Sequence, residues 1–291
     1  MSPSRSRWNI KGIQSRVGLL VVLGVLTSML LPGWIASKSL AALTEEILSG
    51  RLREAAAATG HLVAVVDREW GRLQEVASGP GIAAHHDDAE SQALVLSALR
   101  TSYLRAELMR DTYVTDAEGR VRLREPYEGP ADPVVLPGAG DALRSGRPTA
   151  TGLVNGPHGP AVFLFVPFRD WTGQPAGLVA GEIDPRSSRF AAVLVEHNAR
   201  SSGGSVDVID STGVILASTD QARQGAASDH RQLLANLIRT GGSTRGTCHS
   251  CHEGSERRTT DLMAFASARS LGWGVRVREP ESSALADTTR L

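Results

Sequence analysis

A run of twenty uncharged, mostly apolar residues near the amino terminus constrains this chain more than any other feature. The run covers residues 17–36 and follows a segment with four basic residues and no acidic one. At about 1.5 Å per residue, a helix of this length spans about 30 Å, the thickness of a bilayer's hydrocarbon core. Because basic flanks stay in the cytoplasm, we expect a cytoplasmic tail over residues 1–16, a transmembrane anchor over 17–37 and a main domain outside.

A cleaved signal peptide is the alternative interpretation of this segment, with cleavage after the SLA at residues 39–41. The apolar run is longer than the hydrophobic region of a typical signal peptide, about 7–15 residues, which favours an uncleaved anchor. Both interpretations place the remainder of the chain on the outer side of the cytoplasmic membrane. The sequence contains no second segment with the length and apolarity of a span.

Charge and motif content exclude several functional classes. Lys and Arg total 31, as do Asp and Glu, so the net charge is zero and nucleic acid is not an expected partner. The sequence contains no G-x-S-x-G, Walker or H-E-x-x-H motif, so we expect no enzymatic activity, and any enzymatic output region would lie beyond residue 291. Two cysteines are too few for a disulfide framework.

The periodicity of apolar residues predicts a long helix and then two similar modules. Residues 38–77 are rich in Ala, Leu, Glu and Arg, lack proline and repeat apolar residues at helical spacing. Strand pairs with an Asp-x-x-Gly turn are then expected at 111–126 and 204–220. Each is followed by a second strand pair, at 159–184 and at 261–279. Antiparallel sheets with helices to one side indicate an α+β fold.

The order of these segments resembles that of double Cache domains, the extracytoplasmic, PAS-like input domains of bacterial sensor kinases, chemoreceptors and cyclic-di-GMP enzymes. The resemblance rests on YVTDAEGRVRL, AVFLFVPFRDWTGQPAGLVAGEID, VDVIDSTGVILASTD and LMAFASARSLGWGVRVREP, and it covers most of residues 37–283. It implies a stalk helix followed by two Cache modules with antiparallel sheets. The membrane-distal module would cover residues 78–199 and the membrane-proximal module 200–283.

The same resemblance implies partners and a location. The protein would be a homodimer in the bacterial inner membrane, with a periplasmic domain and a downstream kinase, chemoreceptor or cyclase region. Residues 284–291 would lead back towards the membrane. In the family a second span and a cytoplasmic region follow the last strand, whereas this sequence stops at Leu291. We therefore expect either a fragment or a departure from the family's signalling pattern.

The motif Cys248-His249-Ser250-Cys251-His252 carries the chemistry of the sequence. C-x-x-C-H is the attachment pattern of c-type haem, in which two thiols form thioethers with the porphyrin and the following histidine binds the iron. Attachment takes place outside the cytoplasm, where the predicted topology puts the motif. We therefore predict one covalent haem c, held by Cys248 and Cys251, with His252 as the proximal iron ligand.

Two other interpretations of the motif remain open. The cysteines could form a disulfide or a redox pair, but this does not account for His252. Zinc could bind two cysteines and two histidines, although no second cysteine pair supplies the usual spacing. For the sixth position of the iron, Met263 and His230 are candidates, and an open position would admit O₂, NO or CO.

The sequence thus predicts a haem-c sensor that detects redox state or a diatomic gas and signals across the membrane. An electron-transfer cytochrome is one alternative. Another is a small-molecule-binding Cache domain, because some relatives bind amino acids through the first module. Tyr113, Arg124 and Tyr127 match that set in part, but its tryptophan is missing.

Overall fold

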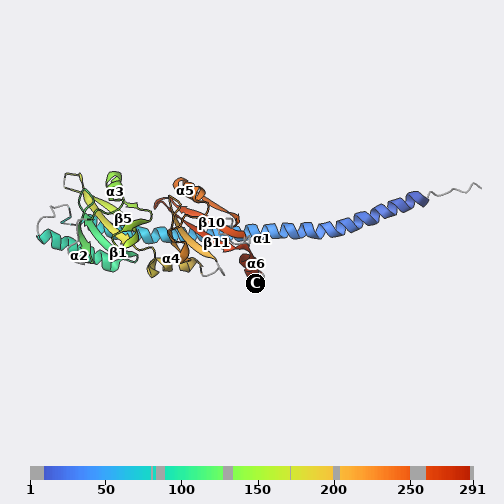
Figure 1. Ribbon diagram of the computed structural model, residues 1–291, viewed down its shortest axis with the longest axis horizontal. Coiled ribbons are helices and arrows are strands. Elements are labelled where there is room, and N and C mark those ends of the chain that lie inside the picture. Colours follow the sequence, from blue (N-terminus) through green and yellow to red (C-terminus); the bar gives the residue numbers. More distant parts are fainter. Residues whose placement is uncertain are drawn as a thin grey trace, which may run out of the picture. The chain divides into compact units, whose positions relative to one another are not determined.

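A computed structural model of the chain describes residues 10–79, 81–82, 89–126, 134–170, 172–198, 204–249 and 260–288. The chain divides into two compact units, residues 1–47 and 48–291. The second unit contains both β-sheets, so the predicted modules belong to one compact body (Figure 1). The fold class is confirmed: a long, initially apolar helix precedes α+β modules with antiparallel sheets.

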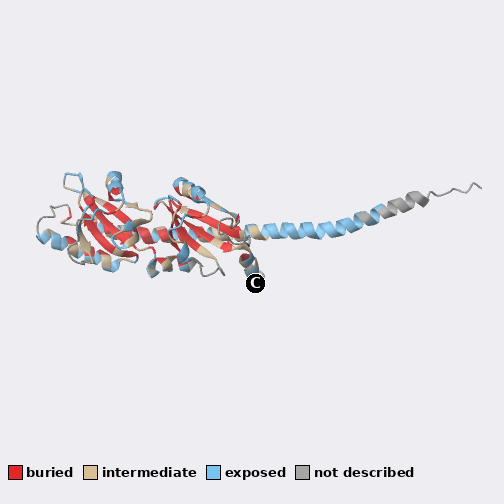
Figure 2. Ribbon diagram, viewed as in Figure 1, coloured by how far each residue is buried: buried red, intermediate tan, exposed pale blue. Residues whose placement is uncertain are grey.

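Helix α1 (Ile10–Ala77) combines the predicted anchor and the predicted stalk in 68 residues. Leucine, valine, methionine and tryptophan side chains between Leu19 and Leu40 are exposed (Figure 2). A continuous exposed apolar surface of this kind is uncommon in a protein surrounded by water. Among the described residues, α1 is the one helix long and apolar enough to cross a membrane.

The first module contains a sheet with the strand order β2-β1-β6-β5-β3, and the short strand β4 pairs with β5 outside this path. All its pairings are antiparallel. Along the chain, helix α2 precedes the first strand of the sheet and α3 lies between β2 and β3. The bounds are α2 Ala89–Arg105, β1 Met109–Thr115, β2 Val121–Glu125, α3 Ala139–Ser145, β3 Thr149–Ala150, β4 Val154–Gly156, β5 Gly159–Arg169 and β6 Pro175–Ile183.

The second module repeats this plan with the strand order β8-β7-β11-β10-β9, again antiparallel. Helix α4 leads into it, α5 lies between β8 and β9, and α6 follows the last strand. The bounds are α4 Ser188–Asn198, β7 Ser205–Asp210, β8 Ile215–Ser218, a 3₁₀ turn η1 Gln221–Arg223, α5 Arg231–Thr240, β9 Ser243–His249, β10 Thr260–Ala268, β11 Trp273–Pro280 and α6 Glu281–Thr288.

The two Asp-x-x-Gly turns have the same construction. Asp116 Oδ1 accepts hydrogen bonds from the backbone N–H groups of Glu118 and Arg120, and Asp210 Oδ1 accepts them from the second and fourth residues after it. Gly119 and Gly213 both have φ +79°, a left-handed conformation that glycine adopts without strain. The repeated strand–turn–strand prediction is therefore confirmed.

The core lies between α1 and one face of each sheet. One cluster of buried side chains joins residues of α1, such as Leu62, Val65 and Leu73, to valines and alanines of both sheets (Figure 2). The opposite face of the first sheet packs Phe163 and Phe165 against α3. The opposite face of the second sheet packs part of its surface against α5. Each module thus has one face on α1 and a second face under a short helix.

The connection between β3 and β4 contacts the second module. The indole Nε1 of Trp273 donates a hydrogen bond to the carbonyl of Thr151 at 3.0 Å. A Cβ added at Gly152 would lie 2.4 Å from Asp210 Oδ2, so only glycine fits there without displacement. Thr151 is also held by Phe163, whose N–H donates to Thr151 Oγ1 at 2.9 Å. Through Thr151, the contact therefore ties strand β5 of the first sheet to Trp273, the first residue of β11.

Glu69 fixes the junction between α2 and β1. Its buried Oε1 accepts backbone N–H groups of Glu107 at 2.6 Å and Leu108 at 3.1 Å and pairs with Arg72 at 2.8 Å. We expect Glu69→Ala to lower the free energy of unfolding by about 2 kcal/mol, because the buried N–H of Leu108 and the part-buried N–H of Glu107 lose their acceptor. The urea midpoint of the full chain measures this change. The exposed Asp67→Ala on the same helix should shift the midpoint little, and an equal loss in both variants would contradict the assignment.

Several short elements were not predicted, and one of them contains part of the haem motif. The motif precedes the strand pair predicted at 261–279, and no strand was predicted at its position. Instead Thr247, Cys248 and His249 end strand β9, which pairs with β10. The segments α3, β3 and β4 were also not predicted. Pairing with a neighbour, rather than an apolar pattern of their own, holds these strands in place.

Candidate functional site

Cys248 lies near the end of β9, the edge strand of the second sheet. Its backbone is opposite Asp261 of β10, and its side chain is 9% exposed. Burial raises the pKa of the Cys248 thiol above its ordinary value. Cys251 and His252 lie outside the described residues. Of the three residues predicted to hold the haem, the structure therefore describes Cys248.

The imidazole of His230 contacts the thiol of Cys248. Its Nε2 lies 3.0 Å from Cys248 Sγ, although the two residues are 18 positions apart. His230 directly precedes α5 and has a backbone φ of +60°. Among the described residues, the other positive φ values belong to glycines. Non-glycine residues in this conformation are often found at functional sites. His230 was expected at the helix start, and the structure brings it beside the motif.

Met263, the other candidate for the sixth position, lies in β10 and is 7% exposed. It is opposite Gly246 on β9 and Arg278 on β11. Because side chains alternate along a strand, Met263 points to the same face as Asp261 and Cys248. The structure therefore gathers Cys248, His230 and Met263 around one end of one sheet face.

The same face carries a network of buried charges. Three arginines and three aspartates form it. Arg276 contacts Asp207 at 2.7 Å and Arg278 contacts Asp229 at 3.0 Å. Further pairs join Arg223 to Asp229 and Arg278 to Asp261. Asp207 and Arg276 are both 0% exposed. Buried charges are tolerated when paired in this way. One half of the face is thus apolar, under α5, and the half next to Cys248 is charged.

Strand β11 ends, and the chain continues into α6, at the same end of the sheet as Cys248. Cys248 is opposite Asp261, and Asp261 is opposite Pro280, the last residue of β11 before α6. The preceding residue, Glu279, is buried and accepts a hydrogen bond from Arg51 Nε of α1 at 2.9 Å. Cys248 on β9 is therefore separated by strand β10 from β11, whose Glu279 forms the ion pair with Arg51 of α1.

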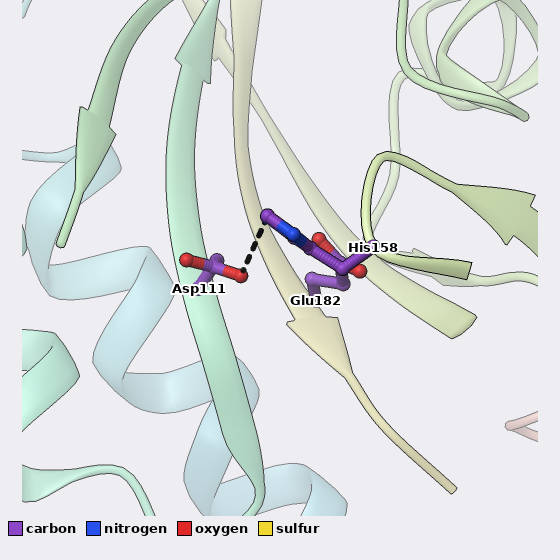
Figure 3. A group of neighbouring side chains, drawn as sticks. All are labelled: Asp111, His158 and Glu182. Carbon is purple, nitrogen blue, oxygen red and sulfur yellow. Dashed lines mark ion pairs between the residues drawn. The ribbon is translucent and has the colours of Figure 1, made fainter. Parts of the chain in front are cut away.

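A second group of polar side chains lies on the face of the first sheet that packs against α3 (Figure 3). Asp111 of β1 and Glu182 of β6 are buried, and His158 reaches them from the turn between β4 and β5. His158 Nε2 is 3.5 Å from Asp111 Oδ2, and the ligand atoms of the three residues lie within 4.8 Å of one another. Tyr113 donates its hydroxyl to Glu182 at 2.5 Å.

Two arginines complete this distal cluster. Arg124 of β2 pairs with Asp111 at 3.1 Å, and Arg110 pairs with Glu182. Burial is the main cause that raises the pKa of Asp111, and Arg124 opposes it; burial and Glu182 raise the pKa of Tyr113. The three potential metal ligands could hold a cation. However, two guanidinium groups already balance the two carboxylates, so an added cation would lack a counter-charge.

The sequence predicted this cluster only in part. Tyr113 and Arg124 were identified as a partial amino-acid set, and the structure brings them together, with the Arg124 guanidinium 5.9 Å from the Tyr113 ring centre. Tyr127 lies outside the described residues. His158, Glu182 and Asp111 were not predicted to form a site. The available signal for Asp111 and Glu182 was that each is an acidic residue within a mostly buried strand.

Comparison with known proteins gives a likeness of fold without a sequence family. No family model matches the chain, and no curated protein matches its sequence. The structure is similar to an extracellular ligand binding receptor from Desulfohalobium retbaense, with a TM-score of 0.60, 12% identity and 78% of this chain covered. This chain spans only 39% of the length of that receptor chain.

Two other similar structures are covered almost completely. The ligand binding domain of the Pseudomonas aeruginosa amino acid chemoreceptor PctB, in complex with L-Arg, has a TM-score of 0.61 and 19% identity over 83% of this chain and 98% of that one. The sensor domain of the V. cholerae histidine kinase DctB has a TM-score of 0.59 and 13% identity over 81% and 98%. These neighbours are sensor or ligand-binding domains rather than catalytic ones. The chain therefore has the fold of extracellular, Cache-type sensor domains.

Proposed function

We propose that this chain is the periplasmic input domain of a membrane-anchored sensor and carries one covalent haem c on its second module. The observation that carries the proposal is the complete C-x-x-C-H motif behind a predicted membrane anchor. Cys248 and Cys251 would hold the porphyrin and His252 would bind the iron. The output would be a kinase or chemoreceptor region, of the kind to which the structural neighbours belong.

The described residues around Cys248 fit such a group. The thiol lies at a sheet edge, on a face with a nearby imidazole, His230, and a thioether, Met263, either of which could serve as the second axial ligand. Arg223 and Arg278, which are partly exposed, provide guanidinium groups that could pair with propionates. When bound, the haem would supply an iron that changes oxidation state or ligand.

The protein's part in signalling would be to pass a change at Cys248 towards the membrane. Strand β9 pairs with β10, whose register places Asp261 between Cys248 and Pro280. Pro280 leads into α6, and its neighbour Glu279 is paired with Arg51 on α1. A shift of β9 and β10 would therefore alter both the start of α6 and the ion pair between Glu279 and Arg51 of α1. A stimulus biases this equilibrium only if it favours one of the two arrangements.

The absorption spectrum of the full chain, matured with a cytochrome c assembly system, tests the proposal. We expect a Soret band that stays with the polypeptide after denaturation, and a mass increased by one haem. Colourless protein with the mass of the translated chain would refute the haem. If the haem is present but hydrogen exchange of β9–β11 is identical in ferric, ferrous and CO-treated protein, electron transfer replaces sensing as the function.

A second candidate function is recognition of a small zwitterion by the distal cluster. Asp111 and Glu182 could receive an ammonium group, and Arg124 could receive a carboxylate. Solved neighbours carry ligands of this chemistry: PctB is described in complex with L-Gln and with L-Arg, and PctC with GABA. The mixed charge of the cluster is the observation that favours this candidate.

We expect Arg124→Gln to weaken binding of an amino acid by about 10- to 100-fold, because a charge-assisted hydrogen bond to a carboxylate contributes about 1.5–3 kcal/mol. Isothermal titration of the full chain with L-Gln and L-Arg measures the change. Arg144→Gln is the matched control, since Arg144 belongs to the same module and is exposed. Failure of both ligands to bind the unaltered chain, or equal affinity in both variants, would contradict the candidate.

A further inference from the structure

A cavity of about 320 Å³ lies between the end of α1 and helix α2, and its described lining comes from these two helices and from Gly79, the second residue after α1. Arg72 and Val76 line it from α1, and Leu94, Ala98, Ser102 and Arg105 line it from α2. None of these residues belongs to the two groups described above. Ligand pockets of small molecules typically start at about 300 Å³, so the cavity is large enough to be one.

The sequence of α2 explains why the helices leave this space. Val95, Leu99 and Ser102 are buried at helical spacing, so Ser102 occupies a position of the apolar stripe where a larger side chain would fill the gap. Ala98, also small, lies half-buried one turn before it. Leu94 is 52% exposed although it lines the cavity. The cavity therefore has an apolar part formed by Val76, Leu94, Val95 and Ala98. The polar side chains of Arg72, Glu75, Ser97, Thr101 and Arg105 also line it. Ser97 and Thr101 are exposed, so the buried hydroxyl in the lining is that of Ser102.

That hydroxyl is the second observation that points to a ligand. Ser102 is only 5% exposed, and its Oγ has no hydrogen-bond partner among the described residues. Buried hydroxyl groups nearly always have a partner, so an unpaired one beside a cavity invites a ligand atom. Arg105 lines the cavity, is exposed and has no ion pair within the described part of the chain. Arg72, in contrast, is already paired with Glu69 and Glu107.

We propose that this cavity binds a small carboxylate with an apolar body, such as an aromatic or branched aliphatic acid. The body would lie between Val76, Leu94 and Ala98, a polar atom would pair with Ser102, and the carboxylate would pair with Arg105. The volume is about twice the roughly 150 Å³ that accepts benzene, which suits one ring with a short substituent. The site requires neither the haem nor the distal cluster.

Binding of phenylacetate and of its neutral amide, phenylacetamide, tests the proposal. Saturation-transfer NMR and equilibrium dialysis on the full chain in lipid nanodiscs should show saturable binding, tighter for phenylacetate. Ser102→Leu, which fills the cavity, should abolish binding of both probes. Leu104→Ala is the matched control on α2, since Leu104 is 71% exposed and does not line the cavity, and it should leave binding unchanged.

Two further variants separate the contacts. Ser102→Ala keeps the cavity and should weaken both probes by about tenfold, the effect of one hydrogen bond. Arg105→Gln should weaken phenylacetate and leave phenylacetamide unchanged. If Ser102→Leu does not fold, Ala98→Leu narrows the same space and should give the same loss. Absence of saturable binding by the unaltered chain, or binding that survives both leucine variants, would overturn the proposal.

Discussion

Replacing both Cys248 and Cys251 with serine is expected to abolish covalent haem in protein matured with a cytochrome c assembly system. The reason is that both thioether bonds depend on these thiols. His252→Ala should keep the covalent bond but change the spectrum, because the iron loses its proximal imidazole. Haem staining after denaturing electrophoresis, together with the Soret band of the native protein, measures the two effects separately.

His249→Ala provides the matched control, because His249 lies between the cysteines and has no expected role at the iron. Its haem content and spectrum should equal those of the unaltered chain. An unchanged covalent yield in the double serine variant would contradict the attachment. If His249→Ala gave the spectral change expected of His252→Ala, the proximal ligand would be wrongly assigned while the attachment itself would stand.

Arg276→Ala is expected to lower the free energy of unfolding by about 3–5 kcal/mol, the usual cost when one partner of a buried ion pair is removed. Arg276 and Asp207 are both fully buried, with Arg276 Nη2 and Nε at 2.7 and 2.9 Å from Asp207 Oδ2. In the variant, the partners left to the Asp207 carboxylate among the described residues are Ser218, at 2.6 Å, and Arg223, at 3.4 Å. The urea midpoint of the full chain measures the loss.

A double variant shows whether the loss comes from the orphaned charge. Arg276→Met combined with Asp207→Leu removes both charges and should recover most of the stability, since apolar replacements of a buried pair are often neutral. Arg144→Ala in the exposed pair with Asp141 should change stability by less than about 1 kcal/mol. A double variant as unstable as Arg276→Ala would indicate that shape, rather than charge, determines the stability here.

The sequence predicted those parts of the fold whose signals are local. The Asp-x-x-Gly turns at Asp116 and Asp210 identified both first hairpins, because the aspartate and the glycine determine the turn. Strand β9 escaped prediction because STRGTCH has no alternation of apolar residues. It is an edge strand, and its pairing with β10 holds it in place. Such a contact joins distant residues and leaves no periodic pattern.

The same limit applied to the candidate sites. The C-x-x-C-H motif is contiguous, so the chain alone suggested its chemistry. The distal cluster draws Asp111, His158 and Glu182 from three elements, and only the register of β1 against β6 and the β4–β5 turn brings them together. The proximity of His230 to Cys248 likewise depends on how α5 lies over the sheet.

The bond from Trp273 to Thr151 and the missing side chain at Gly152 have a consequence for protein engineering. A chimera that joins one half of this body to the other half of a relative would separate the indole from its carbonyl acceptor. Any larger residue at position 152 would force the halves apart at Asp210. A chimera would therefore need to keep Thr151 and Gly152 of the first module together with Asp210 and Trp273 of the second. Recombination should succeed only between chains that have the same residues at these contacts.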